Sequence, residues 1–313
     1  MKTVTAVTLN PCTDRTLQIP QLIPGEHHVV QSIIENAAGK GIDVNAVLAH
    51  IGVPTLAIGF EFSRGGEGIR RFLEEEGIPF RFHAIEGEQR VNTKVFDLAA
   101  RQMTEINCKG PKLDPAEGDA FLKLLEEVLP ETAVLVVCGS VPPGLSPDLY
   151  RRAIELAHAQ GIPCVLDATG PLLVEGLKAN PDVIKPNIGE LELLLGKKLN
   201  GTAECVAACR ELTAQGVGTV CLTLGKDGAV MVSNEEVWFS EGLDIAVRGA
   251  QGAGDSVVAG ICAAMLKTQD RGEWLRSGVA AAHGSLIREG TLLCEKDAYD
   301  DFLSRMPVSR LSI

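Results

Sequence analysis

A short glycine-rich stretch in the last third of the chain has the residue types that chemistry on a phosphate needs. Gly252 and Gly254 stand immediately before an acid, Asp255, and the apolar run that follows has the spacing of a helix. Glycines at a helix start let backbone N–H groups turn towards one point, where the helix dipole adds positive charge. The stretch therefore favours an anion such as phosphate, with Asp255 left to act on a second group. An ordinary acid in the first turn of a helix is the alternative, and this stretch alone does not decide between the two.

A second glycine-rich helix start lies earlier in the chain, at Gly39-Lys40-Gly41. It lacks the glycine spacing and the following Ser or Thr of a Walker loop. Lys40 could pair with a substrate phosphate while Asp43 and Asn45 hold sugar hydroxyls. The alternative is a glycine turn that carries a solvated lysine.

One predicted strand carries two cations and an amide, at Arg90, Asn92 and Lys94. Residues two apart in a strand point to the same side, so these three side chains share one face. Such a row can clamp a phosphate, and it would be a locally basic patch in a chain whose net charge is −12. The polar outer face of an edge strand is the alternative.

The segment from Lys185 to Glu190 precedes another apolar helix. Asn187 followed three residues later by Glu190 fits a variant of the capping box, in which the two side chains bond the first backbone N–H groups of a helix. The same two residues could help to hold hydrated Mg²⁺, which keeps several waters and uses few protein ligands. Both interpretations can hold together, because a cap fixes the geometry that a metal needs.

Thr223 ends a predicted strand, and Gly225 and Gly228 follow it in a tight turn. A hairpin turn is one interpretation, and an edge that contacts a nucleotide is the other. The spacing does not decide between them.

The elements that must position these residues alternate between strand and helix. Asp14 follows the first predicted strand, Thr3–Leu9, at the sheet edge where ligands collect in open α/β folds. Regular alternation through the rest of the chain predicts an α/β fold with a doubly wound, mainly parallel sheet covered by helices on both faces. Early strands without a following helix predict a small separate sheet, at His28–Ile34, Val91–Leu98 and Met103–Asn107.

The composition excludes several classes of function. A net charge of −12 argues against binding to nucleic acid or to an anionic membrane surface, both of which need broad basic patches. No apolar run approaches the ~18 residues that a membrane span needs. The nine cysteines show no metal-binding spacing, and the first residues predict a strand instead of a signal peptide, so we expect reduced thiols in a cytoplasmic protein.

Taken together, the motifs resemble the PfkB carbohydrate kinases of the ribokinase-like fold. The matches run in order from Thr8-Leu9-Asn10-Pro11-Cys12-Thr13-Asp14 to Gly252-Ala253-Gly254-Asp255 and cover nearly the whole chain. The resemblance implies a single α/β domain over residues 1–313, with a small β-sheet lid built from about 15–34 and 88–107. It also implies a homodimer joined through the lid.

The resemblance assigns roles to residues of this sequence. It implies that Asp255 is the base that takes a proton from the sugar hydroxyl, and that the N–H groups of Gly252, Ala253 and Gly254 hold the transferring phosphoryl group. It implies that the sugar phosphate is bound by Asp14, Gly39, Lys40, Gly41, Asn45, Arg90, Asn92 and Lys94. It implies that ATP is bound by Lys185, Asn187, Thr223, Gly225 and Gly228, and that Asn187 and Glu190 hold Mg²⁺ through water.

Within the family, the motifs are similar to the branch that phosphorylates ketohexose phosphates with ATP and Mg²⁺; a monovalent cation is a further cofactor candidate. The Arg90-x-Asn92-x-Lys94 strand favours fructose 1-phosphate, with tagatose 6-phosphate and fructose 6-phosphate as alternatives. A non-catalytic sensor of sugar phosphate or nucleotide would be expected to lose the acid or the loop glycines. A nicotinamide dehydrogenase would need G-x-G-x-x-G after its first strand, where this chain has Asn10-Pro11. The pair Ala250-Gln251 departs from the family, and the sequence offers no reason for it.

Overall fold

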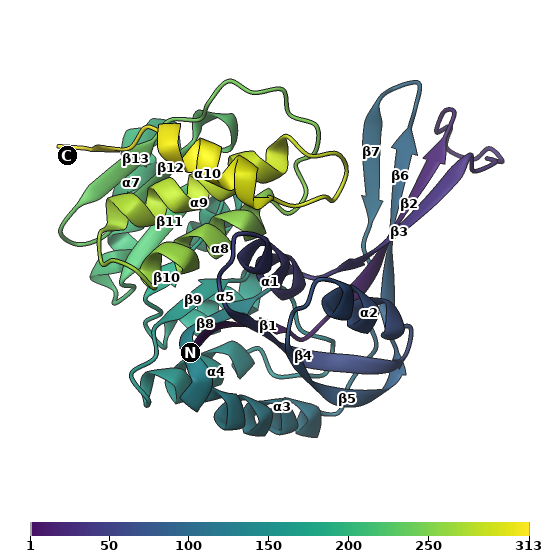
Figure 1. Cartoon of the computed structure of the whole chain (residues 1–313), viewed down its shortest axis with the longest axis horizontal. Coiled ribbons are helices and arrows are strands. Elements are labelled where there is room, and N and C mark those ends of the chain that lie inside the picture. The colour runs from purple at the N-terminus through teal and green to yellow at the C-terminus, as the bar shows by residue number, and fades with distance from the viewer. Residues whose placement is uncertain (1, 313) are drawn as a thin grey trace.

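The computed structural model describes residues 2–312. Its main element is a large sheet of ten strands in the order β14-β13-β12-β11-β10-β9-β8-β1-β4-β5 (Figure 1). The strands are β1 (Thr3–Thr8), β4 (Thr55–Arg64), β5 (Phe80–Glu88), β8 (Thr132–Cys138), β9 (Cys164–Asp167), β10 (Val183–Ile184), β11 (Thr219–Thr223), β12 (Ala229–Val232), β13 (Val237–Ser240) and β14 (Ser309–Arg310).

Along the sheet, the neighbouring strands β11-β10-β9-β8-β1-β4-β5 all pair in parallel. The central strands of this run are buried on both faces. In β8, Leu135 and Val137 belong to one apolar core while Val134 and Val136 belong to another. Successive residues of a strand point to opposite faces of the sheet. Because an apolar core covers each face, every residue of β8 from Val134 to Val137 is apolar. The predicted doubly wound, mainly parallel sheet is confirmed.

Helices cover both faces of this sheet (Figure 1). One core is shared with α3, α4 and α7, and the other with α1, α8, α9 and α10. The helices are α1 (Lys40–His50), α2 (Glu67–Glu75), α3 (Pro115–Val128), α4 (Leu149–His158), α5 (Gly170–Leu177), α6 (Ile188–Leu195), α7 (Gly201–Ala214), α8 (Ala253–Met265), α9 (Arg271–Leu286) and α10 (Lys296–Arg305). Within residues 2–312, none of the helices combines the length and the hydrophobicity needed to cross a bilayer.

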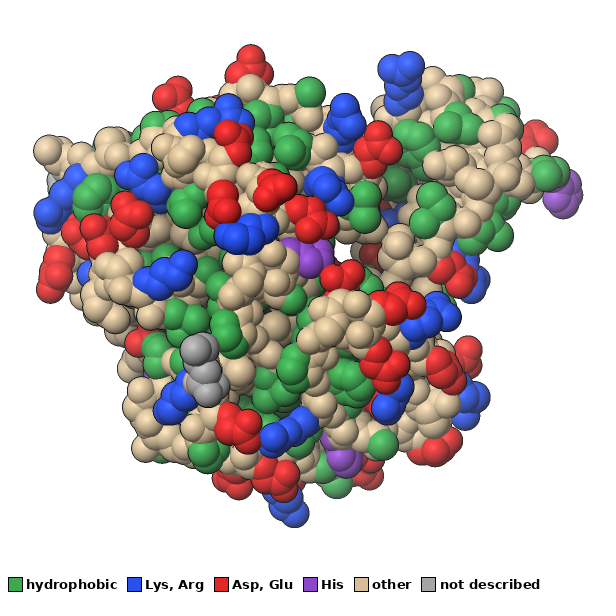
Figure 2. All heavy atoms as spheres, in the orientation of Figure 1, with side chains coloured by type: hydrophobic (Ala, Val, Ile, Leu, Met, Phe, Trp, Pro, Cys, Tyr) green, Lys and Arg blue, Asp and Glu red, His purple; other side chains and the backbone are tan. Residues whose placement is uncertain are grey.

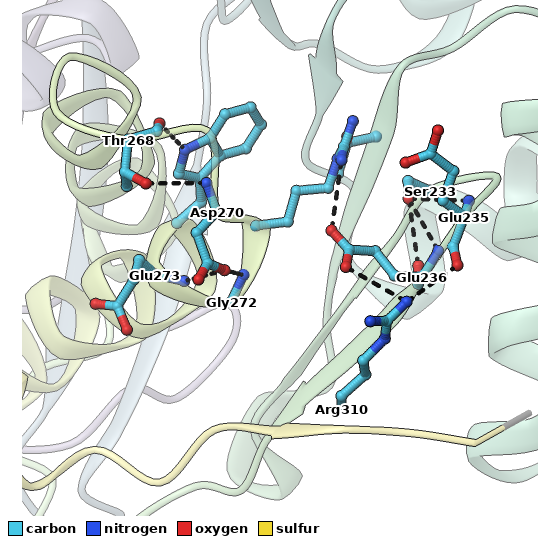
Figure 3. A network of polar contacts seen from close by, with 11 residues as sticks. Ser233, Glu235, Glu236, Thr268, Asp270, Gly272, Glu273 and Arg310 are labelled. Carbon is cyan, nitrogen blue, oxygen red and sulfur yellow. Dashed lines mark hydrogen bonds and ion pairs between the residues drawn. The ribbon is translucent and has the colours of Figure 1, made fainter.

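The far edge of the sheet is antiparallel. The predicted turn after β11 reverses the chain into β12, and β13 and β14 continue the edge. Arg310 on β14 contacts Glu235 and Glu236, while nearby Asp270 accepts a hydrogen bond from the Gly272 N–H at the start of α9 (Figure 3). Strands β5, β13 and β14 are not predicted by the sequence pattern, because β13 and β14 have only four and two residues and β5 is an edge strand with few buried residues.

A separate sheet of four strands, in the order β3-β2-β6-β7, projects from the body at the upper right of Figure 1. The predicted strands at 91–98 and 103–107 are found within one residue, but the strand predicted at His28–Ile34 begins only at residue 32. Asp14 lies inside a strand of this small sheet, not beyond the end of β1, because the chain enters that sheet directly after β1. The strands are β2 (Cys12–Ile19), β3 (Ser32–Ala38), β6 (Arg90–Asp97) and β7 (Gln102–Ile106).

Two helices that begin beside the carboxyl ends of the parallel strands frame the centre of the molecule. α1 packs on α8, and α8 packs closely on α9, where Gly260 faces the backbone of Ser277 and Gly278. A side chain at residue 260 would lie 2.7 Å from the Gly278 Cα, closer than real Cβ atoms come. The glycine therefore sets the distance between the helix that carries Asp255 and its neighbour.

We predict that Gly260→Ala lowers the free energy of unfolding by about 1–3 kcal/mol, because the methyl group overpacks the α8–α9 contact. Gly68→Ala is the matched control: residue 68 is also helical, and nothing lies within 4 Å of its added Cβ. That control should gain about 0.5–1 kcal/mol from better helix propensity. Urea unfolding of both variants measures the difference, and an equal or greater stability of Gly260→Ala would contradict the packing.

Candidate active site

The glycine-rich stretch predicted to bind an anion, residues 249–254 and called the anion loop below, leads directly into α8. Gly252 is the N-cap of that helix with φ 72°, in the left-handed region that favours glycine. An added side chain there would also collide with Leu293. Asp255 lies in the first turn of α8 and is buried. The local structure therefore agrees with a helix start that presents N–H groups and a buried acid side by side.

Two lysines from distant parts of the chain converge at this helix start. The Nζ atoms of Lys40 and Lys185 lie 3.0 and 3.5 Å from Oδ1 of Asp167, at the carboxyl end of β9. Lys185 also packs against Gly254, with its Nζ 3.5 Å from the position a Cβ would take. The bare glycine thus leaves room for the ammonium group beside the N-terminus of α8. Two cations and a helix N-terminus together form a site for a phosphate.

Burial raises the pKa of Asp255 to about 6, because the charged form loses water. Lys40 and Lys185 act in the opposite direction and limit the rise, while Asp167 adds to it. For Lys40, burial disfavours the charge, but Asp167 and Asp255 raise its pKa above the usual value. At neutral pH the site therefore holds a carboxylate that can accept a proton next to a lysine that stays charged.

The prediction for Asn45 is wrong in its placement. Its side chain is fully buried, where Nδ2 donates to the Gly41 carbonyl at 2.6 Å and Oδ1 accepts from Thr55 Oγ1 at 2.5 Å. These bonds hold the first turn of α1 and leave the amide inside the body, and Asn45 lines neither of the two hollows described below. Asp43, two residues earlier on the helix, is the side chain that faces the hollow beside Asp14.

A first hollow of about 240 Å³ opens at the ends of β1, β8 and β9. Three of its buried oxygen atoms have no hydrogen-bond partner: Thr8 Oγ1, Asn10 Oδ1 and Asp167 Oδ2. Unpaired buried oxygens of this kind suit a ligand rich in hydroxyl groups. That Thr8 and Asn10 line this hollow could not be predicted from the sequence, because only the chain path brings their oxygens beside Asp167. The lining residues are Thr8, Leu9, Asn10, Gly39, Lys40, Arg90, Cys138, Gly139, Ser140, Asp167, Ala168 and Thr169.

A second hollow of about 460 Å³ lies between the four-stranded sheet and the body, where Figure 2 shows a recess in the surface. Its walls come from strands of the small sheet on one side and from α1, α2, the anion loop and the loop after α9 on the other. The polar lining residues are Asp14, Asn36, Asp43, His50, Glu76, Lys94, Glu105, Gln251, Arg288, Thr291 and Glu295.

The predicted row on β6 is confirmed as one face of a strand. Asn92 Nδ2 donates to Oδ1 of Asp14 at 3.0 Å, and Lys94 Nζ lies 2.5 Å from Oδ2 of the same carboxylate. Arg90 donates to the carbonyls of Asn10 and Cys108 and lines the first hollow, whereas Lys94 lines the second. The two cations therefore reach different hollows, and Lys94 is paired with Asp14 in this structure.

The capping box on α6 is confirmed. The Asn187 N–H donates to Glu190 Oε2 and the Glu190 N–H donates to Asn187 Oδ1, both at 2.9 Å. An isolated bridge joins Asn187 to Thr223 at the end of β11. Gly225 and Gly228 hold the turn with φ of 64° and 92°, and a side chain at Gly228 would collide with the Ser240 carbonyl. The hairpin turn is thus established, and contact with a nucleotide remains a prediction.

The structure supplies a reason for Gln251, which the sequence left unexplained. Gln251 Nε2 donates to Oε1 of Glu105 on β7 at 3.2 Å. The bond joins the anion loop to the small sheet across the second hollow. No local signal could have predicted it, because the two residues are 146 positions apart.

One further group of side chains could hold a metal ion, at His158, Cys164 and Asp182. His158 Nε2 lies 3.0 Å from Asp182 Oδ2, which also accepts from the Cys164 backbone N–H at 2.7 Å. The cluster sits where β9 begins, at the opposite end of that strand from Asp167. Hydrogen bonds within the cluster account for its geometry.

Comparison with known proteins gives a family match over most of the chain. Residues 5–298 match the family described as "pfkB family carbohydrate kinase". A protein named 1-phosphofructokinase from Escherichia coli strain K12 is 32% identical over 280 residues, 89% of each chain. A crystal structure of phosphofructokinase-2 from Escherichia coli in complex with potassium has 27% identity, a TM-score of 0.91 and coverage of 97% and 99%. Ribokinase from Arabidopsis thaliana shares the fold, with 20% identity, a TM-score of 0.81 and coverage of 97% and 99%. The predicted ribokinase-like fold with a smaller sheet is confirmed.

Proposed function

The chain belongs to the pfkB family of carbohydrate kinases, and from this premise we propose that it phosphorylates fructose 1-phosphate with ATP and Mg²⁺. That it is a sugar kinase, transferring phosphate to an alcohol group, follows from the family and from relatives named 1-phosphofructokinase and phosphofructokinase-2. The preference for fructose 1-phosphate rests on the 1-phosphofructokinase relatives at about 30% identity and on the cations of β6.

The observation that carries the proposal is the position of Asp255 beside Lys40 and Lys185 at the start of α8. In the transfer, the sugar hydroxyl oxygen forms a bond to the terminal phosphorus of ATP as the bond from phosphorus to the ADP oxygen breaks. The hydroxyl proton passes to Asp255. The N–H groups of residues 252–254 and the two lysines stabilise the charge on the phosphoryl oxygens. Positioning and charge neutralisation supply most of the catalysis in reactions of this type.

The residues proposed for Mg²⁺ fit that ion by their chemistry. The Asn187 amide and the Glu190 carboxylate offer the oxygen ligands that Mg²⁺ prefers, and the capping box holds both in a fixed geometry. When bound, the ion would neutralise charge on the ATP phosphates. Lys185, Thr223, Gly225 and Gly228 complete the proposed nucleotide side. A monovalent cation remains a candidate, because phosphofructokinase-2 has been solved in complex with potassium.

The proposed sugar-phosphate site spans the two hollows, of which the first is lined by Lys40 and Asp167 and the second by Gln251 and Gly252 of the anion loop. Hydroxyl groups would donate to the unpaired oxygens of Thr8, Asn10 and Asp167 in the first hollow. The existing phosphate of the sugar would be held by Arg90 and Lys94. Lys94 would then exchange part of its contact with Asp14 for the phosphate, whose negative charge would offset the weakening of that ion pair.

Fructose 6-phosphate is the second candidate acceptor, because phosphofructokinase-2 from Escherichia coli has been solved in complex with it. Tagatose 6-phosphate is the third. A role as a non-catalytic sensor is not favoured, since Asp255 and the glycines of the anion loop are all present.

We further propose that the four-stranded sheet is a lid and joins two copies of the chain. Apolar side chains are exposed on this sheet, which Figure 2 shows as green patches. On its strands, Ile33 is 60% exposed, and Ile34, Met103 and Ile106 are also open to solvent; Val29, in the connection between β2 and β3, is 84% exposed. Exposed apolar groups gathered on one small element are typical of a protein interface.

We expect Asp255→Asn to lower kcat by about 10²–10⁴-fold, the usual contribution of a general base, with little change in sugar-phosphate binding. Wild-type kcat/KM should rise through a pKa of about 6, because Asp255 accepts a proton only once it is ionised. Coupled assays between pH 5 and 9 measure both effects. Near-normal turnover of Asp255→Asn would rule out its role as the base.

The acceptor is tested by steady-state assays with fructose 1-phosphate, fructose 6-phosphate, tagatose 6-phosphate and fructose. We expect the highest kcat/KM with fructose 1-phosphate. Lys94→Ala should raise the KM for the sugar phosphate about 10–100-fold, the value of a charged hydrogen bond, and leave the KM for ATP within about twofold. Lys123→Ala, on the exposed face of α3, is the control. Activity on fructose alone, or equal effects on both substrates, would contradict the proposed clamp.

For the interface, we expect a dimer by sedimentation velocity at micromolar concentration. Ile33→Asp should give a monomer, because a carboxylate buried in an apolar contact loses its water. Val174→Asp changes an exposed apolar residue on α5 of the body and should leave the dimer intact. A monomeric wild type, or equal behaviour of the two variants, would show that the small sheet does not form this interface.

A further inference from the structure

Two buried serines connect the anion loop to the neighbouring helix. Ser256 lies near the start of α8, and Ser285 lies in the last turn of α9. Their hydroxyl oxygens are 2.7 Å apart. Ser256 Oγ also lies 2.8 Å from the carbonyl oxygen of Gly252, the N-cap of α8. The two hydroxyl groups therefore reach from α9 to the glycine at which the helix of the anion loop begins.

The number of protons available decides which group donates in each contact. The Cys294 N–H donates to Ser285 Oγ at 2.8 Å. Because a carbonyl oxygen can only accept, Ser256 uses its single hydroxyl proton on Gly252. Ser285 must then donate its own proton to Ser256. The hydrogen bonds thus run in one direction, from a backbone N–H through two hydroxyl groups to the Gly252 carbonyl.

This direction matters because the Gly252 carbonyl and the Ala253 N–H belong to the same planar peptide group. In a trans peptide these two bonds point in opposite directions. The carbonyl is held inside α8 by two donors, the N–H and the hydroxyl of Ser256, both at 2.8 Å. The Ala253 N–H therefore points out of the helix start, where we place the transferring phosphoryl group.

The surroundings keep this chain of hydrogen bonds in place. Ser256 and Ser285 are 0% and 1% exposed, so water does not compete for their hydroxyl groups. The loop that supplies the Cys294 N–H also places Leu293 against Gly252, because a side chain at residue 252 would collide with it. A helical serine often bonds the carbonyl four residues earlier. Here a second helix and a loop extend that local bond, so the chain is a feature of the tertiary structure.

We propose that Ser256 and Ser285 are positioning residues which fix and polarise the Ala253 N–H for the transferring phosphoryl group. Hydrogen bonds that follow one another in a chain strengthen each other. The donors behind Gly252 draw electron density towards its carbonyl oxygen, so the amide proton of Ala253 becomes more positive. A donor that is fixed before the reaction needs no reorganisation as charge moves, so the chain favours turnover more than ATP binding.

The inference rests on the proposed function and is tested with Ser256→Ala, Ser285→Ala and the double variant. In Ser256→Ala, kcat should fall about 5–20-fold, less than on removal of an oxyanion donor, because the N–H stays but is less well held. In Ser285→Ala, kcat should fall about 3–10-fold, since only the polarising bond is lost. The KM values for ATP and sugar phosphate should stay within about twofold. The double variant should match Ser256→Ala, because Ser285 acts only through Ser256.

Ser277→Ala is the matched control for buried serines. Ser277 is also on α9, and its Oγ donates to the Gly260 carbonyl of α8 at 2.5 Å, away from the anion loop. This variant should lower the unfolding temperature about as much as Ser285→Ala, because each loses a buried hydrogen bond. Its kcat should nevertheless stay within about twofold of wild type, since the Gly260 peptide does not face the phosphoryl group.

The Ala253 N–H can also be followed by NMR without any substrate. Labelling glycine with 13C at the carbonyl and alanine with 15N selects the alanines that follow a glycine, which are Ala229, Ala250 and Ala253. The Ala253 amide proton should move upfield in Ser256→Ala and in Ser285→Ala, because it is less polarised. It should stay in place in Ser277→Ala, and Ala229 on β12 is the internal reference.

Two kinetic results would overturn the proposal: a kcat of Ser285→Ala equal to that of Ser277→Ala, or a double variant whose loss is the product of the single losses. A fall in kcat with an unmoved Ala253 signal would overturn it too. Failure of the proposed function looks different, because wild type would then phosphorylate none of the sugar phosphates while the Ala253 signal still responds to both serines.

Discussion

The negative charge of Asp255 is the constraint on which the rest of the site depends. The carboxylate is buried at a helix start, where an isolated charge would be costly, and in its proposed role as the base it must be ionised near neutral pH. Lys40, Lys185 and the α8 dipole stabilise it from one side. The same lysines are held in place by Asp167, so the arrangement that stabilises the proposed base also holds two cations where we propose that phosphate binds.

The small sheet places further charged and polar side chains on the other side of the second hollow. Asp14, Asn92 and Lys94 bond to one another on neighbouring strands, and Gln251 reaches Glu105 from the anion loop. In this structure the groups proposed for the substrate phosphate are thus paired with other protein groups. A phosphate that binds there would have to replace those partners as ligands of Arg90 and Lys94.

Features that depend on a few consecutive residues could be predicted well. The glycines before Asp255 and the capping box of Asn187 and Glu190 are local, and both are present with the expected geometry. The row Arg90, Asn92, Lys94 shares a strand face because alternation along a strand is local too. The strand pattern could not show that Arg90 lines one hollow and Lys94 the other, because other segments form the hollows into which these side chains open.

The sequence by itself determined the alternation of strands and helices, the doubly wound sheet and the helix start at Asp255, because periodicity and backbone preferences act over short distances. Only the tertiary structure decided which side of α1 meets the site. Asp43 and Asn45 lie about 200° apart around the helix, so they point to opposite sides of it. The contact of Asn45 with Thr55 on β4 turns Asn45 into the core, which leaves Asp43 facing the second hollow. The same holds for Lys40 and Asp167, 127 positions apart, since their contact exists only where the strand ends meet.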